Sequence, residues 1–111
     1  MNELYDEIEQ LIEDITGQIG MPFTLGAFSG MGWCYAPTPM SKDPYPNITI
    51  KQQKNAIHVY YAFWKFNEDE KKRFTSIFGQ SAAGKSCIRI KKMTSERKEA
   101  LAYIINRCKE I

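Results

Sequence analysis

Apolar residues recur every three or four positions over the first nineteen residues, which predicts a helix with one buried face. The opposite face of this helix is acidic. We expect Gly17 and Gly20 to weaken the helix, and Pro22 follows them. The predicted apolar stripe comprises Leu4, Ile8, Leu11, Ile12, Ile15 and Ile19.

The segment from residue 22 to residue 47 is rich in Gly, aromatic residues and Pro. Up to residue 35, Gly alternates with large apolar residues, which predicts one or two short twisted strands with Gly at bulges or turns. Residues 36–47 (APTPMSKDPYPN) contain four prolines, which suit neither a helix nor a central strand. We therefore predict a loop of about a dozen residues here, and loops of this length in small domains often bind ligands.

Alternating residues over 47–52 and a β-branched and aromatic run over 56–64 predict a hairpin with its turn near residues 53–55. Strand alternation divides the second segment between two faces. We assign the more apolar face to the core and expect the other to be more exposed. The core set is Ile57, Val59, Tyr61 and Phe63, and the exposed set is His58, Tyr60 and Trp64.

Polar caps mark two further helices. Asn67 and the acids after it suit the start of a helix that should stop at Gly79. Alternation over 86–93 predicts a strand, and Thr94 caps a last helix with an apolar face from Ala100 to Cys108. The order α, three or four β, α, β, α favours one α+β domain over residues 1–111, with a curved antiparallel or mixed sheet and helices packed on one face.

Hydrophobic residues make up 43% of the chain and charged residues 25%, as in folded globular domains. No apolar run approaches the roughly 20 residues that span a bilayer, and the acidic start lacks the pattern of a signal peptide. We therefore expect a cytoplasmic protein with no membrane partner.

The net charge of +2 is divided unevenly along the chain. Residues 1–20 carry six acids and no Lys or Arg, whereas residues 51–111 carry fourteen Lys or Arg and six acids. This asymmetry indicates either two functional faces or pairing of the first helix with basic elements. Basic residues at 71–73 and 89–92 could form a patch, but no nucleic-acid motif accompanies them, so we do not expect nucleic acid as a partner.

The three cysteines and the one histidine offer few candidates for catalytic residues. Cys34, Cys87 and Cys108 are far apart and form no CxxC pair, so neither a disulfide scaffold nor a structural zinc site is expected. The only nucleophile and base set is Cys34, Cys87 and His58, with Cys34 expected to be the most accessible. Cys87 and Cys108 fall on predicted apolar faces. We predict no enzyme and no catalytic residue.

Residues 79–86 (GQSAAGKS) fit the pattern GxxxxGK[ST] of a phosphate-binding loop. That motif needs a strand before it and a helix after it, because the helix N-terminus faces the phosphates. Here a helix precedes the string and a strand follows. We therefore predict a helix-to-strand loop and no nucleotide hydrolysis, and leave open the binding of another anion by Lys85 and the loop amides.

The stretches ITIKQQKNAIHVYY (residues 48–61) and GKSCIRIKKM (residues 84–93), with the helix between them, are similar to the YdhG-like family. These are small bacterial domains of unknown function, some of them described as frataxin-like or as intracellular iron chaperones. The similarity is best over residues 47–111. It implies an α+β fold with a curved antiparallel sheet, in which residues 84–86 open a strand.

Two functions remain as hypotheses. The favoured one is a small intracellular binding module for a protein or small-molecule ligand. Its pocket candidates are Trp33, Tyr35, His58, Tyr60, Trp64 and Lys85. The alternative is a frataxin-like iron-handling chaperone, because hard cations prefer carboxylate oxygens held close together; a solvated face without metal fits the same pattern. Its metal candidates are Asp6, Glu9 and Glu13 along one line of the first helix and Glu3, Glu7 and Asp14 along another.

Overall fold

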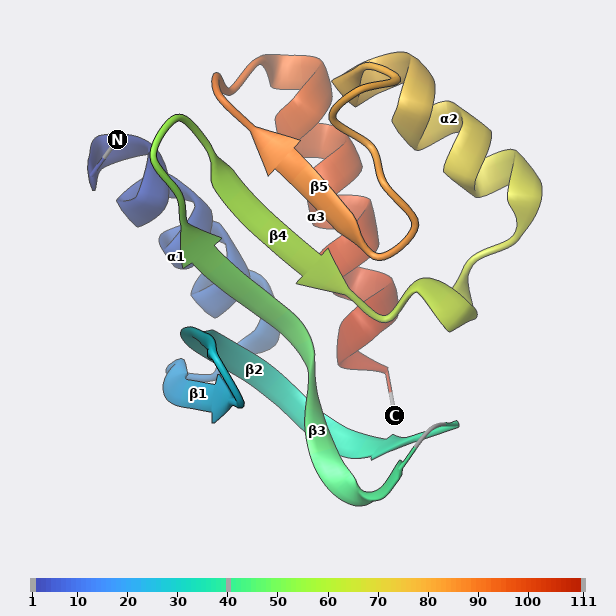
Figure 1. The fold of residues 1–111 in the computed structure, drawn as a ribbon. Helices are drawn as coiled ribbons and strands as arrows, with labels where there is room; N and C mark the ends of the chain where they lie inside the picture. The colour runs from blue at the N-terminus through green and yellow to red at the C-terminus, as the bar shows by residue number, and fades with distance from the viewer. Residues whose placement is uncertain (1, 40, 111) are drawn as a thin grey trace.

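The computed structural model describes residues 2–39 and 41–110 and has an α+β fold (Figure 1). Five strands form an open antiparallel sheet in the order β1-β2-β3-β4-β5, and three α-helices accompany it. The predicted fold class and element order are therefore confirmed. The elements are α1 (Asn2–Thr16), β1 (Met21–Leu25), β2 (Phe28–Thr38), β3 (Ser41–Gln52), β4 (Ile57–Tyr61), the 3-10 turn η1 (Phe63–Lys65), α2 (Glu68–Phe78), β5 (Cys87–Ile90) and α3 (Ser95–Lys109).

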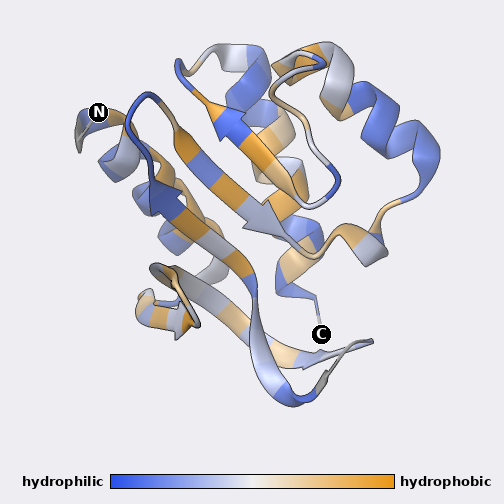
Figure 2. Cartoon of the chain, in the orientation of Figure 1, coloured by the Kyte–Doolittle hydropathy of each residue, from blue (hydrophilic) through white to orange (hydrophobic). Residues whose placement is uncertain are grey.

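One face of the sheet forms the core together with α1 and α3. The register places Trp33 beside Ile48, Ile50 beside Val59, and Val59 beside Ile88, so apolar residues form rows across four strands. Figure 2 shows the alternation of hydrophobic and hydrophilic residues along β3, β4 and β5. Because alternate residues of a strand face opposite sides, the second face of these strands points away from the helices.

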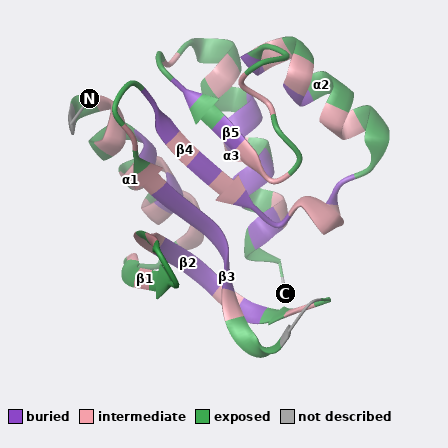
Figure 3. Cartoon of the chain, viewed as in Figure 1, coloured by how far each residue is buried: buried purple, intermediate pink, exposed green. Residues whose placement is uncertain are grey.

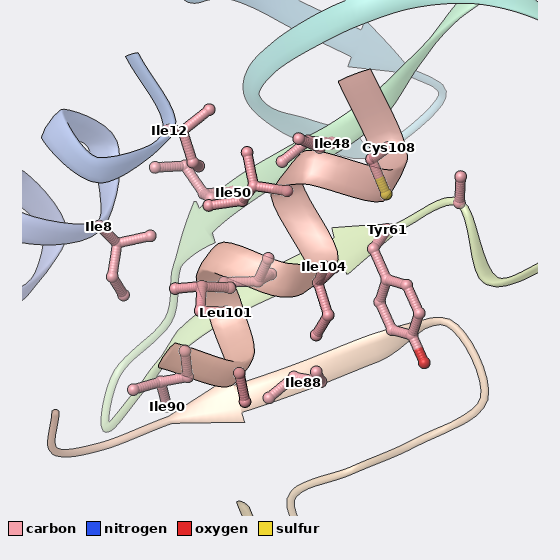
Figure 4. Close-up of a cluster of buried hydrophobic side chains, with 14 of the residues drawn as sticks. Ile8, Ile12, Ile48, Ile50, Tyr61, Ile88, Ile90, Leu101, Ile104 and Cys108 are labelled. Atoms are coloured by element: carbon pink, nitrogen blue, oxygen red, sulfur yellow. The ribbon is translucent and has the colours of Figure 1, made fainter. Parts of the chain in front are cut away.

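The helices contribute a second apolar layer to this core. Figure 4 shows side chains of α1 and α3 meeting those of β3, β4 and β5. α2 packs beside α3 at the β5 edge, where the Phe74 ring meets the Tyr61 ring edge-on with centroids 6.2 Å apart. Each fully buried Ile or Leu contributes roughly 1.5–3 kcal/mol to folding. The Ile, Leu and Val residues of the core with 0% exposure are Ile8, Ile12, Ile48, Ile50, Ile57, Val59, Ile88, Leu101 and Ile105.

Both predicted helix caps are present. The Asn67 side chain accepts a hydrogen bond from the Glu70 N–H, and the Glu70 carboxylate accepts one from the Asn67 N–H, which together form a capping box. Thr94 accepts from the Arg97 N–H at the start of α3. Residues 79–86 connect α2 to β5, as predicted, and Ala83 forms a short bridge with Ile88.

The first helix is shorter than predicted. It ends at Thr16, because Gly17 adopts a left-handed φ of 70° while its N–H still donates to the Glu13 carbonyl. Ile19 lies beyond this end and is 85% exposed, so its assignment to the buried stripe was wrong. The other positions of that stripe are buried or packed against the core.

The proline-rich segment is not the predicted loop. Residues 36–47 belong mostly to β2 and β3, which pair from Met31 with Ile50 out to Thr38 with Ser41. β4 stops opposite Ile48, so the outer part of β3 has β2 as its only neighbour within the sheet. A free strand edge tolerates proline, because the missing N–H need not enter a ladder. Figure 3 shows the far end of this hairpin as exposed.

Candidate binding pocket

The sheet face opposite α1 and α3 is lined by aromatic and small polar side chains. The register sets Thr49 beside Tyr60 and Tyr60 beside Cys87, and all three residues alternate with core residues. Figure 3 shows this second face of β4 as only partly buried, in contrast to the covered core face. Tyr60 and Cys87 are thus partly exposed on this face, whereas Thr49 is buried at 3% exposure.

A cavity of about 410 Å³ opens on this face. Its walls come from the β1–β2 hairpin, the outer β2–β3 hairpin, the middle of β3 and β4, η1, and the end of the loop before β5. The size and the predominantly apolar lining are typical of small-molecule sites. The lining residues are Leu25, Phe28, Thr38, Tyr45, Pro46, Thr49, Tyr60, Tyr61, Phe63, Trp64 and Ser86.

Ring contacts hold the aromatic walls in place. Phe28 and Tyr60 meet edge-to-face with centroids 5.1 Å apart, and Phe63 and Trp64 do the same at 5.3 Å. Edge-to-face pairs contribute roughly 0.5–1.5 kcal/mol beyond their burial. The two pairs therefore form preorganised walls on two sides of the cavity.

Gly30 explains why one of these rings can lie close over the sheet. A Cβ atom at Gly30 would stand 2.7 Å from the Ile50 carbonyl oxygen and 3.2 Å from the Phe28 ring. Only glycine leaves room for this approach. The segment is strand, as predicted, but Gly30 pairs regularly with Phe23 and leaves room for the cavity wall, where a bulge or turn was expected.

The strand predicted over 56–64 is shorter than expected. β4 ends at Tyr61, and residues 63–65 turn into η1, so strand alternation does not place Phe63 and Trp64. Phe63 is half-buried: it packs against the core, as its assignment predicted, and it also lines the cavity, which was not predicted. The Tyr61 N–H donates to the Ser86 carbonyl, which fixes the end of β4 to the loop before β5.

Three lysines approach the aromatic walls. Lys51 lies 5.1 Å from the Phe28 centroid, and Lys85 and Lys71 lie 5.3 Å and 5.8 Å from the Phe63 centroid. These distances allow cation–π attraction. Among the described residues that line the cavity, none is Asp or Glu. The cavity therefore has apolar walls and a basic surround.

The pKa of His58 reflects the positive charge around this face. Burial lowers the pKa of His58 below its ordinary value, and the positive charges of Arg89 and Lys51 lower it further. The ring lies beside Tyr60, with centroids 6.3 Å apart. His58 is thus a neutral side chain in a basic neighbourhood at neutral pH.

The pocket candidates from the sequence fall in three places. Tyr60 and Trp64 line the cavity, and Lys85 borders it through Phe63. His58 and Tyr35 are half-buried outside its lining, with Tyr35 against the Phe23 ring. Trp33 was wrongly included, because it is 1% exposed and packs in the core beside Ile48.

Several lining residues were not among the candidates. Tyr45 and Pro46 were assigned to a loop, although they belong to β3. Thr49 alternates with Ile48 and Ile50, so that pattern already placed it on the face away from the core. Phe28 lines the cavity beside Tyr60, and this contact depends on strand pairing that no local pattern reveals.

The cysteines differ from their predicted environments. Cys34 was expected to be accessible but is buried, and its N–H donates to the Gln18 side chain. Cys87 was expected on the core face but lies beside Tyr60 on the other face. Burial raises the pKa of the thiols of Cys34 and Cys87, and raises the pKa of Cys108 to about 11. An attacking thiolate needs the opposite shift.

The acidic face of α1 is partly engaged within the chain. The Glu13 carboxylate accepts from the Gly20 N–H, and the Asp14 carboxylate accepts from the Gln10 side chain. Burial and the negative charges of Glu13 and Asp6 raise the pKa of Glu9. Within residues 2–39 and 41–110, no group of three or more His, Cys, Asp or Glu is arranged to hold a metal ion.

In the described part of the chain, no helix combines the length and apolarity needed to cross a membrane. Comparison with known proteins finds no matching family model, no matching curated protein and no matching solved structure.

Proposed function

We propose that this chain is a small binding module whose ligand occupies the cavity on the sheet face opposite α1 and α3. The cavity itself carries the proposal, since about 410 Å³ of aromatic-lined space lies on the face that α1 and α3 do not cover. Pockets of roughly 300–1,000 Å³ that combine apolar walls with a few polar groups are typical of ligand sites.

The lining indicates the shape of the ligand. The rings of Phe28, Tyr60, Phe63 and Trp64 offer flat faces and edges, which suit a planar apolar body. Thr49 and Ser86 add hydroxyl groups, and each hydroxyl can both donate and accept a hydrogen bond. We therefore expect an aromatic small molecule or a planar group of a larger ligand.

The two tryptophans provide a direct test, because they lie on opposite faces. Trp64 lines the cavity and Trp33 is buried in the core. We would titrate uncharged 2-naphthamide into ¹⁵N-labelled protein and follow the two indole N–H signals, assigned with Trp→Phe variants. A saturable shift of the Trp64 signal with the Trp33 signal unmoved is expected.

Matched variants on one strand complete this test. Tyr60→Ala removes a cavity wall, whereas His58→Ala removes a ring from the same face outside the lining. We expect Tyr60→Ala to weaken 2-naphthamide binding by about tenfold, or about 1.4 kcal/mol, and His58→Ala to leave it unchanged. Shifts that do not saturate, or equal shifts of both indole signals, would refute the pocket.

A second candidate is iron handling by the acidic face of α1. Burial raises the pKa of Glu9 most, and repulsion from the negative charges of Glu13 and Asp6 raises it further, which supports this role. A bound cation would relieve this repulsion. The test is an anaerobic Fe(II) titration with Mg²⁺ as control. Saturable NMR broadening confined to residues 3–14 and absent with Mg²⁺ would favour this role, and uniform or absent broadening would remove it.

A further inference from the structure

The basic surround of the cavity is concentrated at one aromatic wall. Lys71 comes from α2 and Lys85 from the loop before β5, and both ammonium groups lie within 6 Å of the Phe63 centroid, at 5.8 Å and 5.3 Å. Two distant segments of the chain thus bring like charges to one ring that lines the cavity.

In the described part of the chain, neither lysine has an acidic partner within 4.0 Å, although Lys71 follows the acidic first turn of α2. In residues 2–39 and 41–110, the ion pair between Arg107 and Glu70 is the only one within 4.0 Å. An anion that lies near both ammonium groups is attracted to each of them, and the attraction is stronger in a partly buried site than in bulk water. Ser86 lies next to Lys85 and lines the cavity at the same place, where its hydroxyl can donate to an anion.

We infer that the ligand is an organic anion with a planar apolar body, such as an aromatic carboxylate. The body lies against the aromatic walls, and the anionic group lies beside Phe63 between Lys71, Lys85 and Ser86. This inference rests on the proposed function, because it names the ligand class of the same cavity. It also gives the Gly84-Lys85-Ser86 sequence a role in anion binding without a nucleotide.

A matched pair of probes isolates the charge. 2-Naphthoate and 2-naphthamide share the ring system and the carbonyl group; the carboxylate carries the negative charge, and the amide has an NH₂ donor in place of one carboxylate oxygen. We expect the wild-type protein to bind 2-naphthoate about tenfold more tightly at low salt, a difference of about 1.4 kcal/mol. This preference should shrink as NaCl is added, because salt screens exposed charges.

Variants locate the anionic group. Lys71→Gln/Lys85→Gln should weaken 2-naphthoate binding about tenfold and leave 2-naphthamide binding unchanged. Lys72→Gln/Lys98→Gln removes two exposed lysines elsewhere and controls for the loss of net charge. Lys51→Gln removes the lysine that lies over Phe28 instead.

The outcomes are separable. If 2-naphthamide binds in the cavity but 2-naphthoate is not preferred, the anion inference is wrong and the proposed pocket stands. If Lys51→Gln or the control pair removes the preference as strongly as Lys71→Gln/Lys85→Gln, the placement beside Phe63 is wrong. If neither probe binds saturably, the proposed function fails and this inference fails with it.

Discussion

Gly20 lies where the chain passes directly against the indole of Trp33. A Cβ atom at this position would stand 2.5 Å from Cζ2 and 2.6 Å from Cε2 of Trp33, and 2.7 Å from Cγ of Met31. Carbon atoms in favourable contact are about 3.5–4.0 Å apart. Met31 is partly exposed and can move, but Trp33 is held in a close-packed core.

Gly20→Ala is therefore expected to lower the free energy of unfolding by about 2 kcal/mol, within the range for overpacked cores. Gly20 does not have a positive φ, so backbone strain adds nothing to this cost. The assay is urea unfolding at about 25 °C followed by circular dichroism, with the loss read as a lower midpoint at an unchanged slope.

Two further variants separate the causes. Gly17→Ala has open space around its Cβ but a φ of 70°, so it should cost about 1 kcal/mol from left-handed strain alone. In a Trp33→Leu background the indole is absent. There, Gly20→Ala should lower the free energy of unfolding by well under half of what it does in the wild-type protein. An equal cost of Gly20→Ala in both backgrounds would refute the steric explanation.

Three other predictions concern a cap, a histidine and the thiols. Asn67→Ala removes half of the capping box and should cost about 1 kcal/mol in urea unfolding, whereas Asn67→Asp should keep most of the stability. Because the folded pKa of His58 is lowered, the unfolded chain binds a proton more readily, so stability should fall as the pH drops below about 6.5. His58→Gln should flatten this part of a pH series of unfolding measurements, and an unchanged slope would contradict the assignment. Iodoacetamide on the native protein, mapped by mass spectrometry, should label Cys87 before the buried Cys34 and Cys108, and early labelling of Cys34 would contradict its burial.

Local signals in the sequence predicted the second half of the fold well. Asn67, Gly79 and Thr94 mark helix ends through bonds within one turn, so these ends follow from neighbouring residues alone. The sequence likewise predicted that residues 79–86 connect a helix to a strand, because apolar residues recur with helical spacing before this segment and alternate after it. These features depend little on the rest of the molecule.

The structure of the first half of the chain depends on strand pairing between residues that are distant in the sequence. Cys34 has a left-handed φ of 59°, although it is not glycine. The residues on either side of it differ in environment: Trp33 packs into the core, whereas Tyr35 packs against Phe23 outside the core. Nothing in the identity of a cysteine indicates such a conformation. The prolines of 36–47 likewise argue for a loop until the free edge of β3 is known. The cavity was only partly predictable for the same reason.

The position of α3 has a consequence for synthesis of the protein. α3 covers the apolar face of a sheet whose strands all precede it in the chain. During translation α1 emerges before the strands, but the part of their isoleucine rows that α3 covers stays open to other chains until α3 emerges. Chains interrupted before residue 95 should therefore aggregate rather than fold.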